Sequence, residues 1–268
     1  MKLNKSILYT TMLAVLLSLV SVSCSTTARL GEGEVLYTGV KKLNYKENNT
    51  KIDGDVQDQI FEAIDVAPNN SLYSPYYRTP FPIGLWVYNH WNPNAKGLKG
   101  WLYRKLVSQP VLVSRVRPET RVDMINTLLR NNGYFTSSAS YKLNYSSKNK
   151  KKASITYDVK VNEPYCLGEL KYLNMDTPLT DIIDSVAKKN SYFQTGNRYC
   201  LDSLNAVRIE ITNVLRNKGY YYFKPEYLEY LADSVSAKGT VNLPFDTSGI
   251  SSKRASAPYA NPLLHTEF

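Results

Sequence analysis

The chain has 268 residues, and 33 Lys and Arg against 23 Asp and Glu give it a formal net charge of +10. This length suffices for one large domain or two of roughly 100 residues each. The only histidines, His90 and His265, lack Cys, Asp or Glu at the spacing of a metal site, and the chain contains no Gly-rich phosphate loop and no serine elbow. We therefore expect no enzymatic activity, no metal and no cofactor.

The first 23 residues have the pattern of an export signal. Two early lysines precede an almost wholly apolar run at residues 7–20, and small residues at 21–23 lead to Cys24. Such a run is too short to cross a bilayer comfortably, and the pattern is typical of a cleaved signal. Residues 21–24 resemble the lipobox of bacterial lipoproteins, although the first of them is usually Leu and here is Ser21. We predict that Cys24 is acylated; an uncleaved anchor or a chance cysteine are the alternatives.

The predicted export limits which partners the positive charge of the chain can serve. A chain that leaves the cytoplasm does not meet nucleic acid, so we expect no nucleic-acid partner. The densest basic run, Lys148-Asn149-Lys150-Lys151-Lys152, lies where we predict a hairpin turn. It is either a solvated loop tip or a site of attraction to anionic lipid headgroups.

The first predicted elements are a strand at Val35–Tyr45 and a helix at Val56–Ile64. A long aromatic and proline-rich stretch follows at residues 68–110, with six of the 13 prolines and all three tryptophans, Trp86, Trp91 and Trp101. Loops of this length are usually functional or disordered. The tryptophans suit a membrane–water boundary or a protein interface; alternatively, they pack on the adjoining domain.

An internal repeat is the most informative feature of the sequence. Residues 129–134 (LRNNGY) recur as residues 215–220 (LRNKGY). Each copy ends an apolar stripe of helical period, and each glycine stands where a helix needs a left-handed residue to stop. The two stripes are Val122, Ile125, Leu128 and Leu129, and Leu204, Val207, Ile211, Val214 and Leu215.

After each glycine the apolar period changes from 3.6 to 2, which predicts strands. In the first copy the alternating residues are Phe135, Ala139, Tyr141, Leu143 and Tyr145, in a strand expected to begin at Tyr134, and a second run at residues 153–161 completes a hairpin. In the second copy they are Tyr221, Tyr227 and Leu231, interrupted by Pro225, which is tolerated only at an edge or a bulge. The second copy also predicts a strand at 170–173, a helix from Thr177 to 187 and a strand at 241–245.

This β-α-α-β-β order, with Gly-Tyr after the second helix, resembles the POTRA modules of the BamA/TamA superfamily of outer-membrane insertases. Together with the lipobox and the run at 33–39 (GEVLYTG), it resembles the lipoprotein branch known from the Bacteroidetes translocation and assembly module. The predicted fold class is α+β, with a signal at 1–23, a first POTRA-like domain at 24–162 with the 68–110 insertion, and a second, incomplete one at 163–245. Residues 246–268 lose periodicity and are predicted to be a disordered tail.

The resemblance implies a role in outer-membrane protein assembly or translocation. The chain would be held in the outer membrane by lipid, face the periplasm, and pair exposed edge strands with unfolded outer-membrane or exported proteins. Other components of an assembly module are further implied partners. The edge strands would be residues 134–145 and 220–231, beside a third strand that lies between the other two. Because superfamily members continue into a β-barrel, we expect this chain to be a truncated form.

One alternative comes from a different functional class. The chain would then be a scaffold or glycan-binding lipoprotein that uses Trp86, Trp91 and Trp101, with nearby asparagines at positions 89, 92 and 94. Cys166 and Cys200 are either free thiols or, less expectedly, a disulfide, since an exported chain meets an oxidising compartment.

Overall fold

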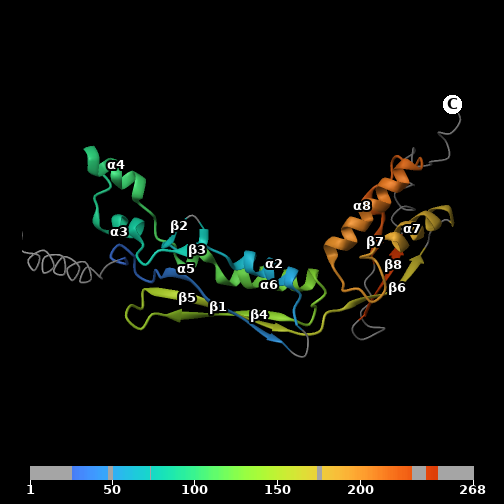
Figure 1. Cartoon of the computed structure of the whole chain (residues 1–268), viewed down its shortest axis with the longest axis horizontal. Helices are drawn as coiled ribbons and strands as arrows, with labels where there is room; N and C mark the ends of the chain where they lie inside the picture. The colour runs from blue at the N-terminus through green and yellow to red at the C-terminus, as the bar shows by residue number, and fades with distance from the viewer. Residues whose placement is uncertain (1–25, 48–50, 73, 174–176, 231–239, 247–268) are drawn as a thin grey trace, which may run out of the picture. The chain divides into compact units, whose positions relative to one another are not determined.

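A computed structural model describes residues 26–47, 51–72, 74–173, 177–230 and 240–246 (Figure 1). Cys24, Leu231 and the tail beyond Asp246 lie outside the described residues. The chain divides into two compact units, one made of residues 1–44, 64–121 and 141–157, and the other of residues 45–63, 122–140 and 158–268. Helices and strands are mixed in both, which confirms the predicted α+β class.

The first sheet has the order β1-β5-β4, from β1 (Leu36–Glu47), β5 (Lys152–Val161) and β4 (Ser138–Tyr145). The two helices predicted for this unit are α2 (Gly54–Ile64) and α6 (Pro118–Asn131), which come between β1 and β4 in the sequence. The third strand in chain order thus lies between the other two, as predicted. Alternate residues of β5 are buried, as its period-2 pattern predicts: Ala153, Ile155, Tyr157, Val159 and Val161.

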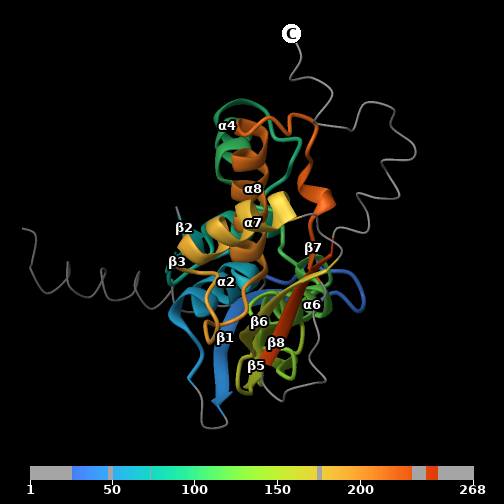
Figure 2. The same cartoon turned by 90° about the vertical axis from the view of Figure 1, so that its right-hand side faces the viewer.

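The second sheet has the order β6-β8-β7 and repeats this arrangement. Its elements are β6 (Cys166–Leu173), α7 (Thr177–Lys189), α8 (Leu201–Asn217), β7 (Glu229–Tyr230) and β8 (Thr240–Asp246). β8 runs parallel to β6 and antiparallel to β7. Helices α7 and α8 lie side by side (Figure 2), and their apolar stripes share one buried cluster with Leu167 of β6.

The 68–110 stretch, compared above with long loops, forms regular secondary structure. It forms β2 (Ser71–Leu72), β3 (Ser74–Arg78), α3 (Ile83–His90) and α4 (Gly97–Leu106), and the short α5 (Val113–Val116) follows. The reason is burial: Leu85 of α3 packs with Leu30, Leu36 and Leu112 in a small apolar cluster. A short helix that gains such a cluster is stabilised by packing even where its sequence is a poor helix former.

Both repeated glycines end their helices by the same hydrogen-bond pattern. Tyr134 N–H donates to Leu129 O (2.8 Å) and Gly133 N–H to Arg130 O (3.1 Å). In the second copy, Tyr220 and Gly219 bond to Leu215 and Arg216 at 3.1 Å each. This is a Schellman motif, which requires a left-handed residue, and Gly133 and Gly219 have φ of 86° and 99°.

The two glycines differ in their surroundings, which gives a matched test. A Cβ on Gly133 would lie 2.9 Å from Tyr199 O and 3.0 Å from Tyr165 O, whereas a Cβ on Gly219 would meet nothing within 4 Å. We expect Gly219→Ala to lower the free energy of unfolding by about 1 kcal/mol from backbone strain. Gly133→Ala should lower it by about 3 kcal/mol, because overpacking adds to that strain. Urea unfolding of both variants checks this, and equal losses would contradict the packing at Gly133.

Candidate functional site

The most prominent candidate site is the backbone edge of β4. Ser146 N–H donates to Lys152 O (2.9 Å), which turns the even-numbered residues of β4 toward β5. Because direction alternates along an antiparallel strand, the backbone groups of Ala139, Tyr141, Leu143 and Tyr145 point to the other side. Among the described residues no strand pairs with that side. Its first N–H, that of Ala139, is taken by Asn126 Oδ1 (2.8 Å).

The two faces of β4 differ in polarity. Ala139, Tyr141 and Leu143 are half-buried, while Ser138, Ser140 and Lys142 on the opposite face are exposed. The Tyr141 hydroxyl donates to Glu119 Oε1 in the first turn of α6, so this tyrosine is held toward the helix. The hydrogen bond lowers the pKa of the Glu119 carboxyl and raises the pKa of Tyr141. At the strand end, Tyr145 is 55% exposed.

Tyr134 is not an edge-strand residue, contrary to the sequence prediction. It precedes β4, its side chain is fully buried, and its hydroxyl accepts a hydrogen bond from Asp53 N–H (3.2 Å). Burial raises its pKa. The next residue, Phe135, also lies before the strand and packs its ring against Tyr165 and Tyr199, with centroids 5.2 and 5.1 Å away. Tyr134 is therefore structural, whereas Phe135 packs on these two rings and keeps 37% of its surface exposed.

The second expected edge is much shorter than predicted. Instead of a strand from 220 to 231, the chain forms a 3-10 turn at Pro225–Tyr227 and the two-residue β7. Pro225 at the start of that turn explains the difference, because its fixed φ suits a helical turn and its missing N–H weakens a ladder. Tyr227 packs on Phe223 inside the domain core, and Tyr221 is exposed outside any strand.

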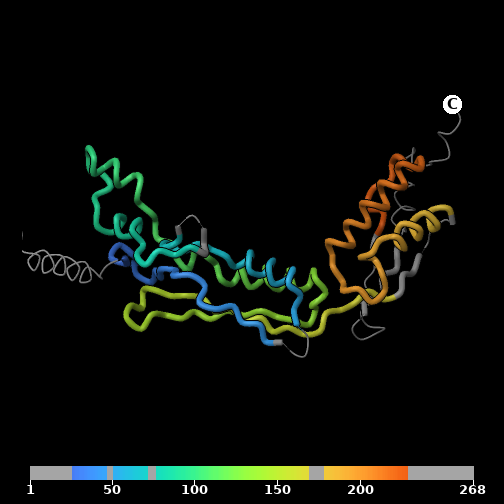
Figure 3. The backbone as a smooth tube through the Cα atoms, in the orientation of Figure 1, coloured from blue at the N-terminus to red at the C-terminus, as the bar shows by residue number. Residues whose placement is uncertain are grey.

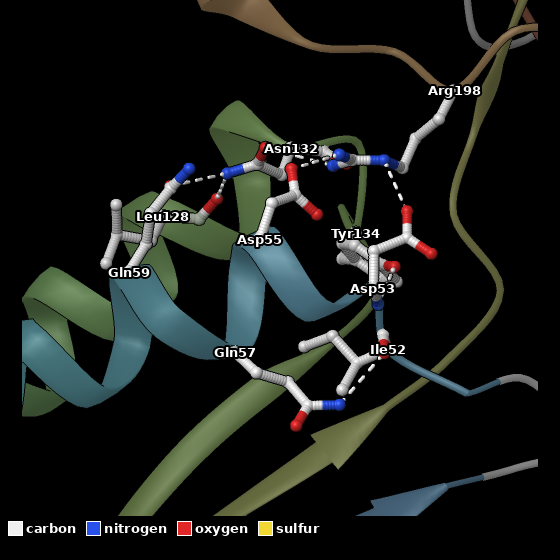
Figure 4. A network of polar contacts seen from close by, with 9 residues as sticks. All are labelled: Ile52, Asp53, Asp55, Gln57, Gln59, Leu128, Asn132, Tyr134 and Arg198. Atoms are coloured by element: carbon white, nitrogen blue, oxygen red, sulfur yellow. Dashed lines mark hydrogen bonds and ion pairs between the residues drawn. The ribbon is translucent and has the colours of Figure 1, made fainter.

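A polar cluster around Arg198 fixes the ends of α2 and α6 (Figure 4). Its guanidinium is bound by Asp53 Oδ2 and Asp55 Oδ2 at 2.8 Å each, and it donates to Asn132 O (3.0 Å) and Oδ1 (2.9 Å). The same group lies 5.9 Å from the Tyr134 ring centroid. The guanidinium nitrogens are thus occupied by protein groups, so the cluster is structural.

The Arg198 cluster escaped sequence reasoning because its members are scattered along the chain. Asp55 and Arg198 are 143 residues apart, and no local pattern connects them. An arginine in the loop before α8 reads from sequence as an ordinary exposed side chain, yet only 19% of its side chain is exposed.

The three tryptophans do not form one surface. Trp86 stacks on His90 with ring centroids 4.9 Å apart and meets Trp91 edge-on at 6.4 Å, and both tryptophans are half-buried. Trp101 on α4 is 51% exposed. Of the predicted contact residues, Trp101 alone therefore presents most of its side chain to a partner.

The segment that follows the predicted lipid site is held from two sides. Asn89 Nδ2 donates to Thr26 O (3.2 Å), and Asn89 Oδ1 accepts from Arg29 N–H (3.0 Å). On the other side, the β4–β5 turn comes beside this segment (Figure 3), where Asn149 Nδ2 donates to Thr27 Oγ1 (3.0 Å) and Lys151 Nζ to Leu30 O (3.1 Å). Sequence reasoning missed these contacts, which join residues over 50 positions apart.

A metal cluster and a membrane-spanning helix are both absent from the described ranges. No cluster of three or more His, Cys, Asp or Glu side chains there is suited to a metal ion. None of the helices in those ranges has the length and apolarity needed to cross a membrane. Cys166 and Cys200 are half-buried free thiols, in line with the expectation that they are not bridged.

No protein-family model matches the sequence, and no curated protein matches it. Solved structures that resemble the chain include POTRA domains 3–5 of BamA from Haemophilus influenzae, with 16% identity and a TM-score of 0.38 over 82% of this chain and 69% of that one. POTRA domains 1–2 of Omp85 from Anabaena give 13% identity and 0.36 over 81% and 98%. The N-terminal domain of Omp85 from Thermosynechococcus elongatus gives 12% and 0.37 over 80% and 63%.

The α+β fold rests on its own element order and sheet topology, described above.

Because Arg198 binds several groups at once, we expect that even a lysine at this position destabilises the protein. Arg198→Lys should lower the free energy of unfolding by about 1–3 kcal/mol, because one ammonium cannot replace the planar fork that serves Asp53, Asp55 and Asn132 together. Lys188→Ala is the matched control: it breaks an exposed pair with Asp184, 2.6 Å apart within α7, and should change stability by less than about 0.5 kcal/mol. Urea unfolding measures both, and a neutral Arg198→Lys would show that the cluster contributes little.

Proposed function

We propose that this chain is a lipid-anchored protein of the outer membrane whose periplasmic domains bind extended segments of unfolded outer-membrane or exported proteins. The binding site is the open edge of β4, and the mode is strand addition. The observation that carries the proposal is the row of outward backbone groups at Tyr141, Leu143 and Tyr145, with no strand beside them among the described residues. The sequence resemblance to POTRA modules and the lipobox-like residues before Cys24 support the setting.

Edge geometry favours β4 over the opposite edge of its sheet. The first residues of β1 are already covered: Tyr37 N–H donates to Val111 O (2.8 Å) and Leu36 bridges Leu112. Farther along, Arg78 Nη1 donates to Thr38 O (3.3 Å). On β4 the cover that the described residues provide is that of Asn126 at Ala139. Proteins usually protect long edge strands from pairing, so an eight-residue strand left open is a site for a partner.

The polarity of the edge matches a barrel-forming client. Strands of membrane barrels alternate apolar and polar residues with a period of two. Added to β4, such a strand places its apolar residues beside Tyr141 and Leu143 and its polar residues beside Ser140 and Lys142. Backbone hydrogen bonds give affinity without a fixed sequence, which suits a protein that serves many clients.

Contacts within the protein already engage part of the polar groups that the glycan-binding alternative would use. Asn89 is occupied on both sides of its amide by Thr26, Leu85 and Arg29, and Asn92 Oδ1 accepts from Asn94 N–H (2.9 Å). Trp86 is stacked on His90 and is not presented as a sugar platform. No contact in this region favours a sugar ligand.

A pair of substitutions at one position separates the backbone from the side chain. Leu143→Pro removes an outward N–H, which the β4–β5 ladder does not use, and should weaken binding of a synthetic barrel-strand peptide about tenfold or more. Leu143→Ala removes the side chain, keeps the N–H and should bind nearly as the native chain does. Fluorescence anisotropy with a labelled peptide measures both affinities, and circular dichroism verifies folding. Equal affinity of the two variants would exclude strand addition at β4.

A further inference from the structure

The positive charge of the chain is concentrated in one stretch. Residues 66–118 contain seven Lys and Arg and no Asp or Glu, so this stretch has a formal net charge of +7 out of +10 for the whole chain. It includes helices α3 and α4, which contact each other. A stretch with this excess of Lys and Arg favours an anionic partner.

Helix α4 presents a face with two large apolar side chains and a lysine within this basic region. Leu98, Trp101 and Lys105 follow at spacings of three and four, so they lie on one face of the helix. Leu98 is 72% exposed and Trp101 51%. Exposed Lys99 and Arg104 flank this face. An exposed Leu and Trp bordered by Lys and Arg are the composition of a helix that lies in the headgroup layer of a membrane.

The segment that follows the predicted lipid site is bonded to helix α3, which contacts α4. The Thr26–Leu30 segment is fixed to α3 by Asn89 and Arg29, and Arg29 Nη2 also donates to Trp91 O (3.1 Å) just after α3. Cys24 is two residues before Thr26, and two residues span at most about 7 Å. An acylated Cys24 therefore keeps α3, and the α4 that packs on it, close to a bilayer surface. Exposed Lys148 and Lys150 lie in the turn that contacts the same segment.

We propose that the exposed Leu98–Trp101–Lys105 face of α4 is a lipid-docking surface that inserts into the headgroup layer of an anionic bilayer, the one that holds the acyl chains on Cys24. The proposal rests on the lipidation included in the proposed function. It replaces the surface predicted from the three tryptophans with one built on Trp101 alone. Lipid attachment and a basic apolar surface together give firmer residence than either signal alone, because their free energies of binding combine.

The test uses the full chain in vesicles of phosphatidylethanolamine and phosphatidylglycerol whose acyl chains are brominated. Bromine quenches tryptophan fluorescence only on contact, so the native chain should be quenched. Trp101→Phe should lose most of that quenching, and the matched Trp91→Phe should keep it. Leu98→Glu, which places a carboxylate in the same face, should lose it as well. Unchanged quenching in Trp101→Phe would overturn the proposal.

Two further measurements distinguish lipid docking by α4 from acylation of Cys24 and from self-association of the chain. Intact mass of the purified chain reports acylation. An unacylated chain that still shows Trp101 quenching retains the docking surface and refutes the lipidation, whereas an acylated chain with unquenched Trp101 refutes the docking surface and leaves lipidation intact. Sedimentation velocity tests self-association: a dimer that Leu98→Glu dissolves, without any native quenching by lipid, would assign the face to a second copy and overturn the proposal.

Discussion

The left-handed turn at Gly133 is the constraint on which the candidate binding edge depends. It ends α6, sends Tyr134 into the core and starts the chain on the path to β4. A Cβ at this position would crowd the carbonyl oxygens of Tyr165 and Tyr199, and Gly133 O accepts from Tyr165 N–H (2.9 Å). Arg198 then covers Tyr134 and holds Asp53, whose N–H binds the Tyr134 hydroxyl. The start of β4 is therefore fixed by packing on one side and by charge on the other.

The repeated parts of the fold were predictable because their helix ends and strand faces are encoded by residues close together in the sequence. The LRNxGY repeat gave both helix ends, and the alternation at 153–161 gave the buried face of β5. Tyr134 was misassigned because a buried tyrosine and a strand tyrosine look alike when alternate residues are apolar. Pro225 was read as a strand interruption, although it starts a helical turn. The helices of the 68–110 stretch were missed because Leu85 is buried by Leu30 and Leu112, which are distant in sequence.

The two proposed surfaces use different chemistry for different partners. The β4 edge offers backbone donors and acceptors, which recognise an extended conformation rather than a sequence. The α4 face offers a leucine, a tryptophan and cations, which suit the disordered headgroup layer of a bilayer, where no fixed partner geometry exists. Tyr141 illustrates why the side chains of β4 are secondary: its hydroxyl already serves Glu119, so its contribution to a client is its backbone.

Hydrogen exchange with a bound client tests the central claim most directly. Amide exchange rates of the full chain are measured by NMR with and without a synthetic barrel-strand peptide. Strand addition predicts that the amides of Tyr141, Leu143 and Tyr145 slow on binding, while Lys142 and Asn144, already bonded to β5, change little. Protection that appears elsewhere, with the outward amides of β4 still exchanging at their free rates, would contradict the account.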